Sequence, residues 1–134
     1  MDDYNLRLFE SGDEGELTNL LELCFRGWPK FELNCSLFDY WRWKHLDNSL
    51  GPSVVILAKT GNQLEGCDQG ILLNIKIFNN IYLCSQDTDD SVNLNFRGMG
   101  MIKKLQNMKL ECARRERTGL ILNSGFLKSN DAQK

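Results

Sequence analysis

Residues 93–102 read NLNFRGMGMI and place Gly98 and Gly100 where a predicted strand gives way to a predicted helix. Backbone N–H groups at a helix N-terminus have no partner within the helix and lie at the positive end of its dipole, so a phosphate can bind there without side chains. Glycine lacks a Cβ atom, which permits close backbone approach and unusual torsions at both positions. The stretch therefore predicts an anion-binding loop.

The residues upstream extend this pattern. Residues 89–98 read DDSVNLNFRG, in which acids and a valine precede an aromatic residue and Arg-Gly-x-Gly. This segment resembles the strand and pyrophosphate loop of the GNAT superfamily of N-acetyltransferases, where the pattern is Arg or Gln, two residues, Gly, one residue, then Gly or Ala. The chain matches at Arg97 and Gly100 and departs at Ile102, and it has Leu94 where many members have proline.

Strands and helices are predicted on both sides of this loop. In the N-terminal third, the sequence predicts a strand over 4–9 and then two helices. The first helix starts at a Ser11–Glu14 capping box and ends at Gly27 and Pro29, and the second begins after Ser36. It then predicts strands over 53–58, on to Phe78 with an irregularity near Gly66 and Gly70, and over 81–92, followed by a helix from 101 to Gly119 and a strand over 119–123. The predicted fold class is α/β (α+β), with a mixed, mainly antiparallel central sheet flanked by helices.

This order resembles the GNAT acyl-CoA N-acyltransferase fold up to about Asn123. We expect one domain over 1–134, with its core at 4–123 and a polar tail or the start of a missing segment at 124–134. GNAT members continue with a helix and two strands, which often carry a tyrosine that acts as general acid. The chain is thus expected to be incomplete at its C-terminus: a fragment, a minimal relative that borrows these elements from a partner, or one that lacks them. An exposed last strand favours a homodimer.

The resemblance implies acetyl-CoA as cosubstrate and indicates where it binds. Backbone N–H groups of 98–103 are expected to hold the pyrophosphate, and residues 91–93 to pair as a strand edge with the pantetheine amides. The expected cofactor-binding residues are Ser91, Val92, Asn93, Arg97, Gly98, Met99, Gly100, Met101, Ile102 and Lys103.

The implied reaction is transfer of an acetyl group from acetyl-CoA to a primary amine by direct attack in a ternary complex. The attacking amine must be neutral, so a nearby carboxylate is a candidate base. Asp89 is the favoured base, because it matches an acidic position in relatives. An equally good interpretation is that Asp89 is a solvated residue at a strand end without a catalytic role. Strand alternation predicts that Asp87 and Asp89 share one face and that Asp90 lies on the other. Tyr82 is the candidate acid.

Several aromatic side chains fit two interpretations. Trp28, Trp41, Trp43 and Tyr40 could shape an acceptor pocket, but aromatic residues at helical spacing more often belong to a core. His45 could be a base, but a lone histidine at a helix end is more often a partner of the helix dipole.

Composition excludes several classes. A net charge of -2 argues against nonspecific nucleic-acid binding, and no apolar run approaches the roughly 20 residues of a membrane span, so a cytoplasmic protein is expected. No metal site is expected, because the chain has one histidine and its cysteines show no C-x-x-C pair; buried thiols are favoured for Cys24, Cys35, Cys67, Cys84 and Cys112. Two alternatives to an acetyltransferase remain. One is a noncatalytic CoA-binding or protein-interaction domain, and the other is a nucleotide-binding phosphate loop, which is less favoured because no Gly-Lys-Ser/Thr is present.

Overall fold

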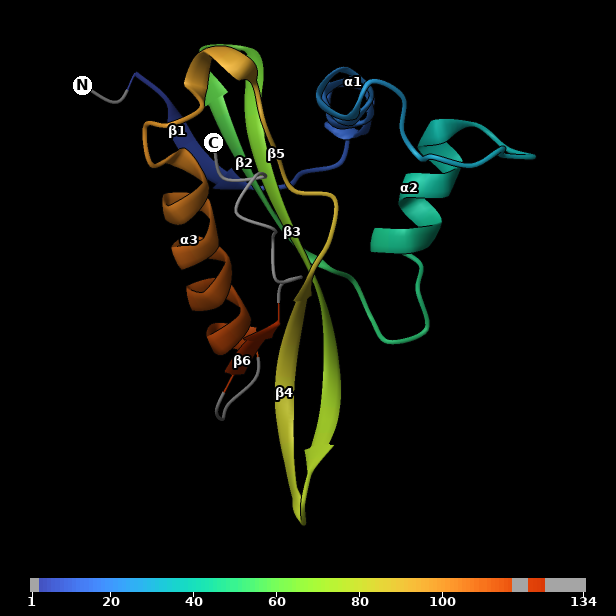
Figure 1. Ribbon diagram of the computed structural model, residues 1–134, viewed down its shortest axis with the longest axis vertical. Coiled ribbons are helices and arrows are strands. Elements are labelled where there is room, and N and C mark those ends of the chain that lie inside the picture. Colours follow the sequence, from blue (N-terminus) through green and yellow to red (C-terminus); the bar gives the residue numbers. More distant parts are fainter. Residues whose placement is uncertain (1–2, 117–120, 125–134) are drawn as a thin grey trace.

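A six-stranded sheet is the centre of the computed structural model, which describes residues 3–116 and 121–124 (Figure 1). Its strands are β1 (Asn5–Leu8), β2 (Val54–Thr60), β3 (Gln63–Ile77), β4 (Asn80–Asp87), β5 (Ser91–Val92) and β6 (Ile121–Ser124). The order is β1-β2-β3-β4-β6, and β5 pairs with β3 beyond the end of β4. All pairings are antiparallel except that of β4 with β6, so the predicted mixed, mainly antiparallel sheet is confirmed.

Helices cover both faces of this sheet. Helices α1 (Glu14–Phe25) and α2 (Leu37–His45) pack on one face, and α3 (Met101–Glu116) packs on the other (Figure 1). A short 3-10 turn, η1 (Leu94–Phe96), leads from β5 towards α3. Residues 88–100, which include β5 and η1, thus connect the end of β4 to the start of α3.

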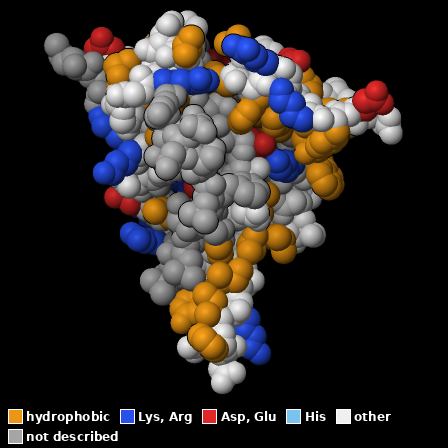
Figure 2. Space-filling model, in the orientation of Figure 1, with side chains coloured by type: hydrophobic (Ala, Val, Ile, Leu, Met, Phe, Trp, Pro, Cys, Tyr) orange, Lys and Arg blue, Asp and Glu red, His pale blue; other side chains and the backbone are white. Residues whose placement is uncertain are grey.

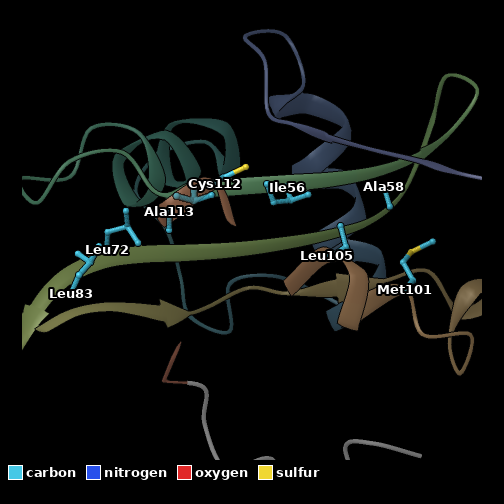
Figure 3. Packing of buried hydrophobic residues seen from close by; sticks show 9 residues of the cluster. Ile56, Ala58, Leu72, Leu83, Met101, Leu105, Cys112 and Ala113 are labelled. Atoms are coloured by element: carbon cyan, nitrogen blue, oxygen red, sulfur yellow. The ribbon is translucent and has the colours of Figure 1, made fainter. Parts of the chain in front are cut away.

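Strand alternation divides the core into two layers. On β2, Ile56 and Ala58 face α3, whereas Val55 and Leu57 face α1 and α2. Figure 3 shows the α3 layer, where Leu105 and its helical neighbours pack against the sheet. The spacing of Met101, Leu105 and Cys112 in the sequence predicts this apolar stripe, which is confirmed. The same spacing places Lys109 on the outer face, but Lys109 is fully buried. Among the cysteines, Cys67, Cys84 and Cys112 are buried, Cys24 is half-buried and Cys35 is exposed.

The two predicted helix starts differ in outcome. Ser36 caps α2 as its Oγ accepts a hydrogen bond from the backbone N–H of Asp39 at 3.0 Å. The Ser11–Glu14 capping box is wrong, because Asp13 occupies the N-cap of α1. The Asp13 carboxylate makes no cap hydrogen bond; it contacts Arg7 twice at 2.7 Å and accepts from the backbone N–H of Glu10 at 2.7 Å.

Glycines on β3 mark places where the sheet meets α3. The pairing of β2 with β3 shifts register between Ala58 and Lys59, opposite Gly66, so the irregularity predicted there is confirmed. Gly70 pairs regularly, which corrects the second half of that prediction. A Cβ atom at Gly70 would lie 2.3 Å from Ser85 Oγ and 3.0 Å from Lys109 Cδ, so glycine provides the space that the buried lysine uses.

The long β3–β4 hairpin extends away from both core layers. Its tip carries Phe78, which is 93% exposed, beside Ile77 and Ile81 (Figure 2). Within the described part of the chain, no helix combines the length and the apolar character that crossing a bilayer requires.

Candidate functional site

The two-glycine loop has the geometry that its sequence predicts. Gly98 and Gly100 adopt positive φ angles of 78° and 79°, a backbone conformation that residues with a Cβ atom rarely adopt. A Cβ atom at either glycine would meet no other heavy atom within 4 Å, so the loop faces open space. Helix α3 begins directly afterwards at Met101, which leaves the N–H groups of its first turn without acceptors in the helix. The arrangement presents backbone donors to a ligand.

Strand β5 presents one residue to the open side of the sheet. Asn93 N donates to Glu65 O on β3 at 2.7 Å, so alternation directs the backbone of Ser91 towards β3 as well. The backbone of Val92 points away from β3, and its carbonyl accepts a hydrogen bond from Arg97 Nε at 2.8 Å. Of the three residues predicted as a strand edge, Val92 is thus the one with its backbone directed outward.

A bulge at residues 88–90 interrupts the strand that the sequence predicts as continuous from 81 to 92. Gln69 on β3 holds all three residues: its carbonyl accepts from Thr88 N at 3.0 Å, its side chain donates to Asp89 O at 2.9 Å, and its N–H donates to Asp90 Oδ1 at 2.9 Å. Trp41 Nε1 donates to Gln69 Oε1 at 2.7 Å and fixes the amide. Gln69 is therefore a positioning residue that sequence reasoning missed.

The bulge changes which aspartates share a face. Asp89 has a positive φ angle of 60°, and its side chain turns towards α2. Asp87 and Asp90 lie on the α3 face together with Asp68. The predicted pairing of Asp87 with Asp89 is therefore wrong, because one left-handed residue breaks the alternation on which it depends.

The Asp89 carboxylate is an anchor for the α1 and α2 side of the protein. Its Oδ1 accepts from Trp28 Nε1 at 2.9 Å, and its Oδ2 lies 2.9 Å from His45 Nε2 and 2.6 Å from Lys44 Nζ. Burial disfavours the charged form, but the hydrogen bonds from His45, Lys44 and Trp28 outweigh it and lower the pKa of Asp89 to about 2. A carboxylate with this pKa is a weak base.

His45 is a neutral, buried partner of this carboxylate. Its ring is fully buried at the end of α2, and its Nδ1 lies 3.0 Å from Ser53 Oγ. Burial lowers its pKa despite the hydrogen bond and charge of Asp89. The neutral ring then donates from Nε2 to Asp89 and accepts at Nδ1 from Ser53. His45 thus lies at the helix end where the sequence predicts it, and its ring is held by Asp89 and Ser53.

A second ionic cluster lies under α3. Lys109 Nζ contacts Asp68 Oδ1 at 3.0 Å and also Asp87, and carboxylate oxygens of Asp68, Asp87 and Asp90 lie within 4.8 Å of one another. Burial, with the hydrogen bond and charge of Asp68, raises the pKa of Asp90 to about 9. Asp90 is therefore protonated at neutral pH, and the lysine ammonium supplies the cation for the other two carboxylates. Sequence periodicity gave no signal for this cluster.

The structure does not bring the predicted acid and base together. Tyr82 pairs with Ile75 near the hairpin end of β4, whereas Asp89 lies beyond its other end. At ~3.3 Å per residue, seven residues of strand separate them by roughly 20 Å.

A pocket of about 390 Å³ opens beside the Asp89 anchor. Its lining residues are Tyr40, Trp43, Lys44, Asn48, Ser49, Leu50 and Ile71. The four aromatic residues that fitted both a core and a pocket are divided between these roles: Trp28 and Trp41 are buried in the core, whereas Trp43 is 64% exposed and lines the pocket with Tyr40.

Solved acetyltransferases have a similar architecture. No protein-family model matches the sequence, and no curated protein matches it significantly. AAC(6')-Iy, in complex with the bisubstrate analogue CoA-S-monomethyl-acetylneamine, aligns with a TM-score of 0.72 at 11% identity, over 97% of this chain and 84% of that one. An aminoglycoside acetyltransferase from an uncultured soil metagenomic sample, in complex with sisomicin, aligns with a TM-score of 0.67 at 16% identity, over 96% and 82% of the two chains.

Two further structures extend the comparison. A predicted acetyltransferase with acetyl-CoA from Clostridium acetobutylicum aligns with a TM-score of 0.66 at 18% identity, over 90% of this chain and 80% of that one. A probable N-acyltransferase from Enterococcus faecalis aligns with a TM-score of 0.69 at 14% identity. The alignment covers 92% of this chain but only 29% of the Enterococcus faecalis chain. At these identities the likeness is one of fold. The expected GNAT-like fold is confirmed: the chain has the fold of these acetyltransferase structures.

Proposed function

We propose that this protein is an acetyl-CoA-dependent N-acetyltransferase that moves an acetyl group to a primary amine by direct attack in a ternary complex. The observation that carries the proposal is the Gly98–Gly100 loop, which has positive φ angles and open space above it at the start of α3 in a GNAT fold. Such a loop suits a pyrophosphate, because both unpaired N–H groups and the helix dipole favour an anion.

The neighbouring residues fit the rest of the cofactor. Arg97 is held against the carbonyl of Val92, which keeps a permanent positive charge beside the loop. The outward-directed backbone of Val92 offers an N–H group to a pantetheine amide, in the manner of an added strand. Acetyl-CoA supplies the thioester, and the residues of this chain bind and orient it.

Asp89 fits a fixed negative charge better than a general base. Donors from Trp28, Lys44 and His45 occupy both of its oxygens, and its pKa of about 2 makes proton uptake unfavourable at neutral pH. We infer that the carboxylate orients α2 beside the reacting amine and that the amine loses its proton to water. The rate should then rise with pH through the pKa of the acceptor amine.

A noncatalytic CoA-binding or protein-interaction domain is the second candidate. Two observations favour it. The described residues place Tyr82 far from Asp89, and both oxygens of Asp89 are engaged by hydrogen bonds. This candidate predicts binding of acetyl-CoA, or of a protein partner, without turnover.

Calorimetric titration with acetyl-CoA, beside ATP as a control ligand, tests the proposal. We expect saturable binding of acetyl-CoA alone, and its loss in Gly100→Asp, where a side chain and a negative charge enter the pyrophosphate site. Gly61→Asp is the matched control, because Gly61 also has a positive φ, of 56°, and open space, but lies in the β2–β3 turn. Unchanged affinity in Gly100→Asp would exclude the loop as the binding site.

Turnover separates the two candidates. Acetyl transfer is followed as release of the CoA thiol over a panel of primary amines. Binding of acetyl-CoA with no thiol release from any amine would favour the noncatalytic candidate, whereas release with one class of amine supports the enzyme.

A further inference from the structure

The pocket beside Asp89 has apolar walls that face solvent. The rings of Tyr40 and Trp43 stack with centroids 6.0 Å apart, and Leu50 and Ile71 complete the walls. Trp43 and Leu50 are 64% and 54% exposed. Large exposed apolar side chains gathered in one place often mark a binding site, and the volume of this open hollow, about 390 Å³, falls within the roughly 300–1,000 Å³ of small-molecule sites.

The charge of the pocket is unusual for a protein that handles amines. Among the described residues that line it, Lys44 is the one charged residue and none is acidic. The carboxylate that pairs with Lys44, that of Asp89, lies 2.6 Å from the ammonium and is also hydrogen-bonded by Trp28 and His45. On the pocket wall, a ligand with several ammonium groups would therefore meet a lysine and no carboxylate among the described lining residues, whereas an uncharged apolar body would meet apolar side chains.

The position of the pocket links it to the proposed site of reaction. Ile71 pairs with Gln86 on β4, three residues before Asp89, and Lys44 joins the pocket to that carboxylate. An amine whose body fills the pocket would thus have its nitrogen near the bulge, where β4 ends and Val92 turns outward.

We propose that this pocket selects a primary amine with one positive charge and an apolar or aromatic body, and that it disfavours polycationic acceptors. The inference rests on the proposed acetyl transfer and names its acceptor class. It distinguishes this chain from the structural neighbour described above as an aminoglycoside acetyltransferase, although the fold is shared.

The kcat/KM values for two probe acceptors, 2-phenylethylamine and spermine, test the inference. We expect at least a tenfold preference for 2-phenylethylamine. Trp43→Ala should raise its KM about tenfold with no change in the affinity for acetyl-CoA, and Trp43→Phe should recover much of the loss. Phe38→Ala is the matched control, because Phe38 is an exposed aromatic residue of the same helix that does not line the pocket.

A charge variant tests the electrostatic part of the argument. Leu50→Glu places a carboxylate on the pocket wall and should improve spermine relative to 2-phenylethylamine by about tenfold. A preference for spermine in the wild type, or no change of preference in this variant, would overturn the inference while acetyl transfer still stands.

Direct binding separates failure of the inference from failure of the proposed function. Calorimetry with 2-phenylethylamine should detect binding that Trp43→Ala weakens, even if no acetyl transfer occurs; that result supports the pocket and contradicts the reaction. If 2-phenylethylamine neither binds nor is acetylated while acetyl-CoA binds normally, the pocket does not hold the acceptor and the inference is wrong.

Discussion

Replacement of Asp90 by asparagine is expected to stabilise the protein at neutral pH. Burial and the neighbouring Asp68 raise the pKa of Asp90 to about 9, so the folded protein holds a carboxylic acid where the unfolded chain has a carboxylate. Asparagine resembles this protonated form. Its oxygen can still accept from Gln69 N, which lies 2.9 Å from Asp90 Oδ1, and its amide can donate to the neighbouring Asp68, as a protonated carboxyl would.

The expected size follows from the linkage between proton binding and folding. Because the folded state keeps the proton between about pH 4 and pH 9 and the unfolded state does not, the stability from Asp90 is complete below pH 4 and declines as pH rises. From about pH 4, where the unfolded carboxyl titrates, to pH 7 is three pH units. At about 1.4 kcal/mol per unit, the free energy of unfolding lost through Asp90 at pH 7 is at most about 4 kcal/mol. Water reaches this half-buried side chain, so we expect about 2 kcal/mol from Asp90→Asn, or roughly 8 °C in Tm.

Thermal unfolding followed by circular dichroism at pH 5, 7 and 8.5 measures the effect. The gain from Asp90→Asn should grow with pH. Asp89→Asn is the matched control with the opposite sign: the pKa of Asp89 is lowered to about 2, so its stability is present above pH 4 and lost as pH falls, and its removal should lower Tm at pH 7. An equal or lower Tm for Asp90→Asn at pH 7, with the pH slope of the wild type, would show that Asp90 is ionised and refute the reasoning.

Three further outcomes are expected. Lys109→Met should cost about 3–5 kcal/mol in urea unfolding at pH 7, because it leaves Asp68 and Asp87 charged and buried; a cost below 1 kcal/mol would mean that the ammonium does not balance them. Gly70→Ala should cost about 1–3 kcal/mol, since its Cβ atom would lie 2.3 Å from Ser85 Oγ, and an unchanged Tm would show that the sheet and α3 can separate there. The kcat of acetyl transfer should rise with pH according to the pKa of the acceptor amine, and a profile common to amines of different pKa would instead indicate a base on the protein.

Local sequence signals predicted the elements and the loop well. The spacing of apolar residues in α3 and the glycines at 98 and 100 depend on neighbours close in the chain, and both were found where they were expected. The burial of Lys109 was missed, because periodicity alone places a lysine on the solvent face, whereas its partners lie 22 and 41 residues away. Such distant pairing leaves no trace in a local pattern.

The arrangement of the aspartates was missed for a related reason. Alternation from Asp87 to Asp90 holds only while the strand is regular, and the left-handed conformation of Asp89 ends that regularity. The bulge depends on Gln69, some 20 residues earlier on another strand, and on Trp41 behind it. The candidate site could therefore be located from the sequence, but the faces of its side chains could not.

The bulge also restricts how this protein can change in length. Asp89 is fastened to one side of the sheet and Asp90 to the other, so successive residues are bound into different layers. Residues 88–90 lie opposite only two residues of β3, because Asp87 pairs with Gly70 and Ser91 pairs with Cys67. Loss of one of the three would remove the bulge without changing the pairing of β5, and with the bulge it would remove the left-handed conformation that directs Asp89 towards Trp28 and His45. Substitutions at 88–90 alter one contact at a time, whereas an insertion or deletion disturbs both layers together. We expect libraries of length variants to retain folded members in the 46–52 connection and to lose them in the bulge.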